Sequence, residues 1–203
     1  AYVEPVVKGD CYQFAVKMGT PPENAKGGTT AGKRAAFICL LSKSPIDYNY
    51  IRSEGKAGRM GQQLMAIVAD SVRGRIYLSP TPEQIAIAES AKPDWSPGMA
   101  LPNNPRDFKT PNYGLTKFSD LFTPRQLVAL TTFSDLVQVA IERCRQDALA
   151  AGFADDGVGL DAGGNGATAY AQAVGVYLGI AVDKTTDYNS SLVAWSPTRD
   201  QAK

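Results

Sequence analysis

Apolar and polar residues alternate along much of the first eighty positions, and a period of two is typical of half-buried β-strands. The segment from Tyr2 to Gly19 alternates on either side of Lys8-Gly9-Asp10, so it predicts two short strands joined by a tight turn. A second hairpin is predicted between Gly61 and Pro80, where apolar and β-branched residues flank a turn at Ser71 to Gly74. These hairpins indicate a small antiparallel β part.

The residues between the two hairpins carry weaker patterns. Thr20 to Lys33 is rich in Pro and Gly and is predicted to be a mobile loop. Arg34 to Leu41 is a strand candidate, followed by a Pro-containing loop and an aromatic stretch from Asp47 to Gly55. We expect Arg52 to Arg59 to form an exposed connection beside the second hairpin.

A change of pattern at Thr81 predicts the first helix. Thr81 has the residue type of an N-cap, Pro82 suits the first helical position, and Gln84 completes a capping box. After this helix, Lys92 to Pro111 contains five prolines and is predicted to be a linker or an extended crossing segment.

The same Thr-Pro-x-Gln signature returns at Thr123 and predicts a much longer helix. The residues that then follow at helical spacing are Leu127, Leu130, Phe133 or Ser134, Val137 and Ile141. This helix is expected to run to about Ala151 and to end at Gly152, with a length of ~40 Å at ~1.5 Å per residue.

A second long helix is predicted from Ala167 to Asn189, because Ala167 to Val182 is apolar and uncharged. We interpret it as a buried core helix, since it lacks the roughly 20 consecutive apolar residues of a membrane span. The glycine-rich loop from Phe153 to Gly166 is short enough to make the two long helices antiparallel neighbours. Gly175 and Gly179 would allow a neighbouring helix to approach closely.

These patterns predict an α+β fold with three parts. Residues 1–80 form a β-rich, basic part, residues 81–110 a helix and the Pro-rich crossing segment, and residues 111–203 a helical part with two long packed helices. The chain begins at Ala1 without a methionine and ends within a polar run, which leads us to expect a piece of a longer protein.

The histidine and cysteine content of the chain rules out several kinds of catalytic site and metal site. The chain has no histidine, so Ser-His-Asp and Cys-His catalysis and His-ligated metals are absent. Its three cysteines, Cys11, Cys39 and Cys144, form no Cys-x-x-Cys pair, and a structural zinc ion needs four N or S ligands. We therefore predict no bound metal, and the sparse, odd cysteine set favours a cytoplasmic location.

The net charge of +1 conceals an asymmetry along the chain. Residues 1–80 hold 11 Lys/Arg against 6 Asp/Glu, whereas residues 81–203 hold 10 against 14. A polyanionic partner is therefore expected to meet the N-terminal part. The candidate DNA-binding residues lie there, interleaved with Tyr48, Tyr50 and Tyr77, and they are Arg52, Lys56, Arg59, Arg73 and Arg75. A solvated sheet face is the alternative interpretation; Lys43 shares the cluster, and Lys109 and Lys117 are weaker candidates.

Two further motifs are interpreted as structural. The glycines of Asp161 to Tyr170 precede a helix, as in a phosphate-binding or methyl-donor loop, but no buried strand precedes them. We interpret this segment as a helix-entry turn. Asp155-Asp156 is interpreted as a solvated loop pair, because acid–base work requires a pocket that raises one pKa.

Four runs of the sequence resemble, in this order, the central region of adenine-specific DNA methylases of bacteria and archaea that carry an embedded zinc ribbon. The runs are GRMGQQLMAIV, PNYGLTKFSDLFTPRQLVALTTFSDLV, GNGATAYAQAVGVYLGIAVDK and DYNSSLVAWSPTRDQ. The similarity is densest from Pro111 to Gln201 and thinner from Ala1 to Pro80.

The resemblance implies transfer of a methyl group from S-adenosylmethionine to the exocyclic amine of adenine in DNA. The family carries its methyl-donor motif before this region and its Asp-Pro-Pro-Tyr motif after it, and neither occurs here. The chain is therefore predicted to be inactive alone, with no catalytic residue, while the full-length parent would use S-adenosylmethionine.

The family's zinc ribbon uses two Cys-x-x-Cys pairs. Cys39 matches the first cysteine of the second pair, and Ser42 stands at its partner position. The resemblance thus implies a degenerate, ribbon-like β part.

An insertion between those two motifs is where one class of amino-methyltransferases places its target-recognition domain. We therefore predict the central insertion of a DNA adenine N6-methyltransferase, which positions or recognises double-stranded DNA and contacts the remainder of the methyltransferase chain. The alternative is a non-enzymatic structural or protein-interaction module that packs on the methyltransferase core. An independent hydrolase is disfavoured by the lack of histidine and of a paired nucleophile and base.

Overall fold

The chain folds as two compact units, each described here by itself. The computed structural model describes residues 1–25, 27–31, 37–104, 106–196, 199 and 201–202. Unit 1 consists of Ala1–Ser90 and Ala100–Lys117, and unit 2 of Ala91–Met99 and Phe118–Lys203. Antiparallel strand pairs occur together with helices, and the two longest helices pack on each other, so the predicted α+β class is confirmed.

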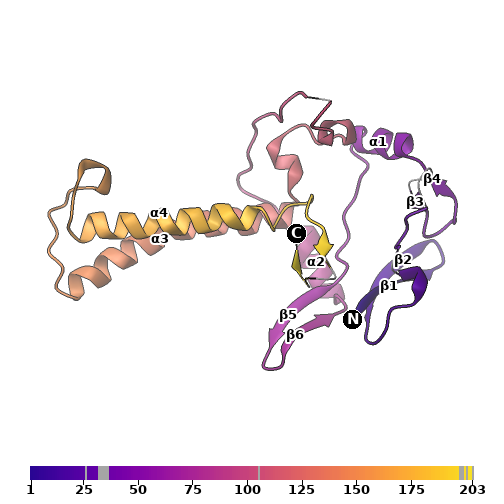
Figure 1. Ribbon diagram of the computed structural model, residues 1–203, viewed down its shortest axis with the longest axis horizontal. Coiled ribbons are helices and arrows are strands. Elements are labelled where there is room, and N and C mark those ends of the chain that lie inside the picture. Colours follow the sequence, from indigo (N-terminus) through magenta and orange to yellow (C-terminus); the bar gives the residue numbers. More distant parts are fainter. Residues whose placement is uncertain (26, 32–36, 105, 197–198, 200, 203) are drawn as a thin grey trace. The chain divides into compact units, whose positions relative to one another are not determined.

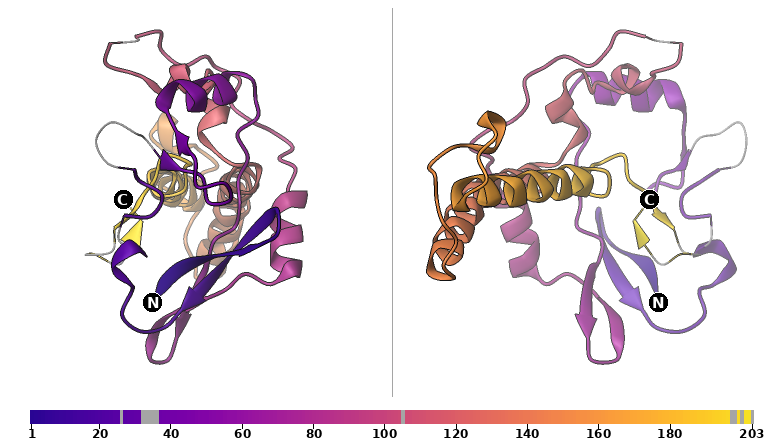
Figure 2. Two further views of the ribbon diagram at one scale, coloured as in Figure 1. Left: turned by 90° about the vertical axis from the view of Figure 1, so that its right-hand side faces the viewer. Right: turned by 60° about the vertical axis from the view of Figure 1, so that its left-hand side comes forward.

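The two longest strand pairs of unit 1 are β-hairpins, as the alternation predicts (Figures 1 and 2). β1 (Tyr2–Lys8) pairs with β2 (Cys11–Lys17) in antiparallel register. β5 (Ile67–Ser71) pairs in the same way with β6 (Gly74–Leu78), and Ser71 lies opposite Gly74 at the turn. Both predicted turns are therefore confirmed.

Two hydrogen bonds that involve side chains join the β1–β2 hairpin to the chain between Gln63 and Ser79. The Val16 N–H donates to the Ser79 hydroxyl at 2.9 Å, and the Gln63 amide donates to the Tyr12 carbonyl at 3.2 Å. Each bond links residues more than fifty positions apart, so pairing within each hairpin is supplemented by contacts that fix one hairpin against the other.

The segment between the hairpins is less regular than predicted. β3 (Phe37–Ile38) pairs with β4 (Pro45–Ile46), so the strand expected over Arg34 to Leu41 is only two residues long where it is described, and residues 34–36 lie outside the described part. The loop predicted over Thr20 to Lys33 includes a short 3-10 helix, η1 (Glu23–Ala25), while residues 26, 32 and 33 lie outside the described part.

The predicted exposed connection from Arg52 to Arg59 is wrong over its first half, which is helical. α1 (Tyr48–Lys56) begins after Asp47, whose carboxylate accepts a hydrogen bond from the Tyr50 N–H at 2.7 Å. The two tyrosines obscured this start, because aromatic residues are also enriched in strands.

α1 contacts the short 3-10 helix η2 (Thr110–Tyr113) through two glycines. A Cβ on Gly55 would lie 2.2 Å from the Tyr113 carbonyl oxygen, and a Cβ on Gly114 would lie 2.1 Å from the Gly55 carbonyl oxygen. Gly114 also has a φ of 85°, a conformation that favours glycine. The contact therefore depends on the absence of side chains at both positions.

The capping boxes predicted for two helices are both present. Thr81 and Gln84 exchange hydrogen bonds at the start of α2 (Pro82–Ser90). Thr123 and Gln126 do the same for the much longer helix α3 (Pro124–Ala150). α3 ends at Ala151 and is followed by Gly152 at a φ of 91°, as the sequence predicts.

The second long helix, α4 (Ala167–Thr186), lies beside α3 in unit 2 (Figure 1). Its buried positions are occupied by small residues: Ala167, Ala169, Ala171 and Gly175. A Cβ on Gly175 would lie 2.4 Å from Ile141 Cδ1 of α3, so the predicted close approach at this glycine is confirmed. Gly179 has open space around it and does not serve the α3 contact.

The remaining elements of unit 2 are short. They are η3 (Phe118–Leu121), η4 (Leu160–Ala162), β7 (Trp195–Ser196) and β8 (Gln201–Ala202). Ser191 donates from its N–H and its hydroxyl to the Leu121 carbonyl, which ties the segment after α4 to the segment before α3. Within the described residues no helix combines the length and the apolarity that a membrane span requires.

Candidate nucleic-acid interface

The five predicted DNA-binding residues fall into two groups on different elements of unit 1. Arg52 and Lys56 lie on α1 and Arg59 follows its C-cap, whereas Arg73 and Arg75 lie at the β5–β6 turn and on β6. The described contacts of α1 are with η2, and those of β6 are with β5 and β2. The five residues therefore belong to two segments of unit 1, one at α1 and one at the β5–β6 hairpin.

Two of the three arginine and lysine side chains near α1 are engaged within the protein. The Arg59 guanidinium donates two hydrogen bonds of 2.7 Å to the Glu54 carboxylate, an arrangement that lowers the pKa of Glu54. Arg52 lies over the Tyr113 ring at 5.5 Å, and its Nε is shielded from solvent without a hydrogen-bond partner. Lys56 is exposed and has no ion pair among the described residues.

The β5–β6 hairpin presents the other two cations. Arg73 is an exposed turn residue and, within the described part of the chain, has no carboxylate within ion-pairing distance. Arg75 lies opposite Asp70 in the strand register. Arg73 and Lys56 are thus the two predicted residues that are exposed and have no ion pair among the described residues.

The aromatic residues near this cluster differ in accessibility. Tyr48 and Tyr50 are 49% and 57% exposed on the first turn of α1, and the Tyr48 ring packs edge-on against Phe37 at 6.3 Å. Tyr77 is half-buried on β6. Two of the three tyrosines that interleave with the predicted DNA-binding residues are therefore exposed, and both lie on α1.

Cys39 lies in the turn between β3 and β4, where the zinc-ribbon resemblance would place a ligand. The Ser42 hydroxyl, followed by the N–H groups of Ser42 and Leu41, hydrogen-bonds the thiol and lowers its pKa. Ser42 supplies oxygen where a second thiolate would be needed, and no three Cys, Asp or Glu side chains converge anywhere in the described residues. The residues present do not fit a structural zinc ion.

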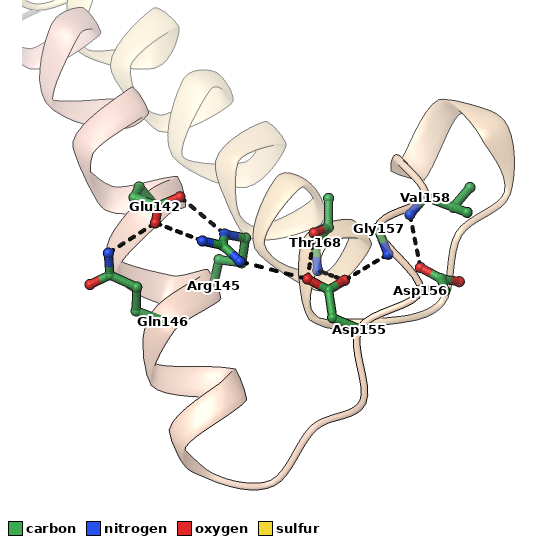
Figure 3. A network of polar contacts seen from close by, with 8 residues as sticks. All are labelled: Glu142, Arg145, Gln146, Asp155, Asp156, Gly157, Val158 and Thr168. Carbon is green, nitrogen blue, oxygen red and sulfur yellow. Dashed lines mark hydrogen bonds and ion pairs between the residues drawn. The ribbon is translucent and has the colours of Figure 1, made fainter.

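Asp155 links the ends of the two long helices, a role that the interpretation of a solvated loop pair missed (Figure 3). Its carboxylate accepts from the Thr168 N–H at 3.1 Å and from the Thr168 hydroxyl at 2.9 Å, and it lies 3.7 Å from Arg145 Nη1 of α3. The bonds from Thr168 lower the pKa of Asp155. Because the residue before α4, Gly166, has no side chain to cap the helix, Asp155 supplies the cap from across the loop.

The glycine-rich loop is filled by its own chain. A Cβ on Gly164 would lie 2.1 Å from the Val158 carbonyl oxygen, and one on Gly166 would lie 2.8 Å from the Asp156 nitrogen. Asp156 accepts from the Val158 N–H at 3.0 Å. These contacts account for the glycines without a nucleotide or a methyl donor, in agreement with the interpretation of a helix-entry turn.

One open depression of about 520 Å³ lies on α3 where the loop begins. Cys144, Phe153 and Tyr170 contribute to its lining, and Arg143 and Asp147 at its edge form an ion pair of 3.0 Å. Among the described residues no three Cys, Asp or Glu side chains gather at this depression, and the one carboxylate in its lining, Asp147, is paired with Arg143.

Comparison of the chain with protein-family models, with curated proteins and with solved structures gave no match.

Proposed function

We propose that this chain is the central insertion of an S-adenosylmethionine-dependent DNA adenine N6-methyltransferase of the cytoplasm, and that unit 1 positions duplex DNA for it. The observation that carries the proposal is the uncompensated positive charge of Lys56 and Arg73 in the part of the chain with an excess of cations. The methyl donor and the catalytic residues belong to the rest of the parent, and this chain supplies none.

From their described contacts we infer different tasks for four of the five cations. Lys56 and Arg73 are accessible for phosphate oxygens, which gives affinity without sequence preference. Arg59 must leave or share Glu54 before it meets a phosphate, so its contribution is smaller. Arg52, held over Tyr113, stabilises the α1–η2 contact and supports the segment that presents Lys56.

The test is a salt titration of duplex binding by the full-length methyltransferase and by its Lys56→Ala/Arg73→Ala variant. Each lost phosphate contact reduces the slope of log affinity against log salt by about 0.9, so the double variant is expected to lose about two units of slope on every sequence. Arg125→Ala removes an exposed cation from α3 and serves as the control. An unchanged slope in the double variant would remove the proposal.

A second candidate function is supported by α4. On its outer surface Tyr170, Val176, Tyr177 and Ile180 are 49%, 55%, 76% and 61% exposed, and no charged residue occurs between Ala167 and Val182. A helix that is apolar all round is normally covered. This favours a structural module whose α4 packs on the methyltransferase core.

This second candidate predicts a stability effect without a DNA effect. Tyr177→Ser/Ile180→Ser is expected to lower the melting temperature of the full-length protein while leaving the salt slope of DNA binding intact. If α4 faces water in the full-length protein, the double substitution changes its unfolding free energy by no more than about 0.5 kcal/mol per site.

A further inference from the structure

One flank of α3 is apolar and exposed along the middle of the helix. Its residues follow one another at spacings of three or four positions, which places them on one side of a helix: Phe133, Leu136, Ala140 and Cys144. The side chains of Phe133 and Leu136 are 54% and 49% exposed. The opposite flank, defined by the same spacing, is polar and consists of Asp135, Gln138, Glu142 and Arg145. The apolar flank is additional to the side of α3 that meets α4 at Ile141.

The same flank continues on α4. Tyr170 of α4 lines the depression of about 520 Å³ together with Ala140 and Cys144 of α3, so these side chains open toward one side of the helical hairpin. Tyr177 follows Tyr170 by about two helical turns and is 76% exposed. Exposed aromatic and aliphatic side chains thus lie on one side of both helices, and a continuous apolar surface of this kind marks an interaction site.

This flank holds both a protrusion and a hollow, at different levels of α3. Phe133 and Leu136 form the protrusion. The hollow begins about one turn later, at Ala140, and its lining extends to Phe153. Such a surface fits a copy of itself, because a two-fold axis between Leu136 and Ala140 sets the Phe133 ring of each copy against the hollow of the other. The same axis sets the large Leu136 against the small Ala140.

The charge and the area of the flank also suit a second copy. The two charged residues in the lining of the hollow, Arg143 and Asp147, form an ion pair with each other, so a partner would bury no unpaired charge there. The 20 residues of α4 extend over about 30 Å, and two helices side by side are about 20 Å wide, which gives a face of roughly 600 Å². Specific interfaces bury about 600–1,000 Å² on each partner. The face is therefore large enough for a stable dimer.

We propose that this flank is the interface of a symmetric dimer, in which the α3–α4 hairpins of two copies of the chain form a four-helix bundle. Bundles of this kind bury the apolar side chains of facing helices in one core. The dimer goes beyond the proposed DNA positioning and does not depend on it, because the candidate DNA-binding residues belong to unit 1. It competes with the second candidate function, since a methyltransferase core packed on the same flank would exclude a second copy.

Sedimentation equilibrium of the full-length protein measures the association. The wild type is expected to be a dimer at micromolar concentration. Phe133→Lys/Leu136→Lys is expected to raise the dissociation constant by about 100-fold or more, because the dimer would bury unpaired charges. Gln138→Lys/Gln146→Lys adds the same charges to exposed positions of the polar flank and is expected to remain a dimer. Circular dichroism of both variants checks that the helices are retained.

A photo-cross-link locates the contact while an aromatic side chain stays in place, and it decides the matter if the lysine variant loses its helices. With p-benzoylphenylalanine in place of Phe133, a mixture of isotope-labelled and unlabelled protein is expected to give mixed-isotope peptides that join position 133 to segment 140–153. The same analogue in place of Gln138 is expected to give none. A wild type that is monomeric at every concentration, or a folded lysine variant that stays dimeric, would overturn the proposal. Cross-links from position 133 to the methyltransferase core would overturn it in favour of the second candidate function.

Discussion

The two units differ in net charge, because the cation excess of the chain lies in unit 1. In unit 2, Arg143 pairs with Asp147, Arg145 with Glu142 and Lys184 with Asp187, so the helical hairpin compensates these charges along its own helices. In unit 1, Lys56 and Arg73 have no such partner among the described residues. Unit 1 thus carries two exposed cations without an ion pair among the described residues, and α4 of unit 2 presents exposed apolar side chains and no charge between Ala167 and Val182.

This difference separates two kinds of binding by their response to salt. Phosphate contacts at unit 1 would weaken steeply as salt rises, because binding releases counterions. An apolar contact at α4 would change little, since it depends on the area removed from water. The close contacts of the two units also differ: Gly55 and Gly114 let α1 approach η2 in unit 1, and small residues occupy the buried positions of α4 in unit 2.

The largest expected effect concerns the α1–η2 contact of unit 1. Gly114→Ala places a Cβ 2.1 Å from the Gly55 carbonyl oxygen and imposes a φ of 85° on alanine. Overpacking and left-handed strain together are expected to lower the unfolding free energy by about 2–5 kcal/mol in chemical denaturation. Gly58→Ala, at a φ of 68° with open space, isolates the strain and should cost about 1–2 kcal/mol. Equal losses at the two positions would contradict the close contact.

Two glycine substitutions in α4 of unit 2 are expected to change the unfolding free energy less, and in opposite directions. Gly175→Ala must displace Ile141, so overpacking of about 1–3 kcal/mol is only partly offset by the roughly 1 kcal/mol gain in helix propensity. Gly179→Ala adds a Cβ in open space and is expected to stabilise the protein by up to about 1 kcal/mol. Thermal unfolding of both variants measures the difference, and stabilisation by both would mean that α3 and α4 are not closely packed.

Asp155 gives unit 2 an acid-sensitive link. The hydrogen bond from the Thr168 N–H is the main cause of the lowered pKa of Asp155. The ionised carboxylate therefore stabilises the fold at any pH above its unfolded pKa of about 3.9. This stabilisation is lost as the pH falls through the lower pKa of the folded state. Asp155→Asn is therefore expected to melt below the wild type at pH 7, with the difference shrinking below about pH 4. Asp135→Asn, an exposed change on α3, is the control. A pH-independent difference for Asp155→Asn would rule out this account.

The smallest effect is a change of reactivity at Cys39 in unit 1. Ser42→Ala removes the hydrogen bond that contributes most to lowering the thiol pKa, so the pKa should rise and alkylation at pH 7.5 should slow. Mass spectrometry of iodoacetamide-treated protein measures the rate, with exposed Cys11 as the internal reference and Ser44→Ala as the control. An unchanged rate in the Ser42 variant would show that the hydroxyl does not stabilise the thiolate.

The helices of unit 2 were predictable because their signals are local. The capping box of Thr123 and Gln126, the helical spacing after it and Gly152 at its end define α3 within a few residues. The uncharged run from Ala167 defines α4 in the same way. Each of these signals acts between residues at most four positions apart, so the sequence contains all the information that they need.

The contacts that organise the candidate sites depended on the tertiary structure. Three contacts illustrate this: Gly55 with Gly114, Asp155 with Thr168 at the start of α4, and Glu54 with Arg59. The residues of the first two pairs are too far apart in the sequence for a periodic pattern to predict their contact. Net charge per segment placed five cations together, but only the folded chain separated the accessible Lys56 and Arg73 from those held by a partner. The physical reason is that exposure and pairing are properties of neighbours in space, which composition and spacing do not determine.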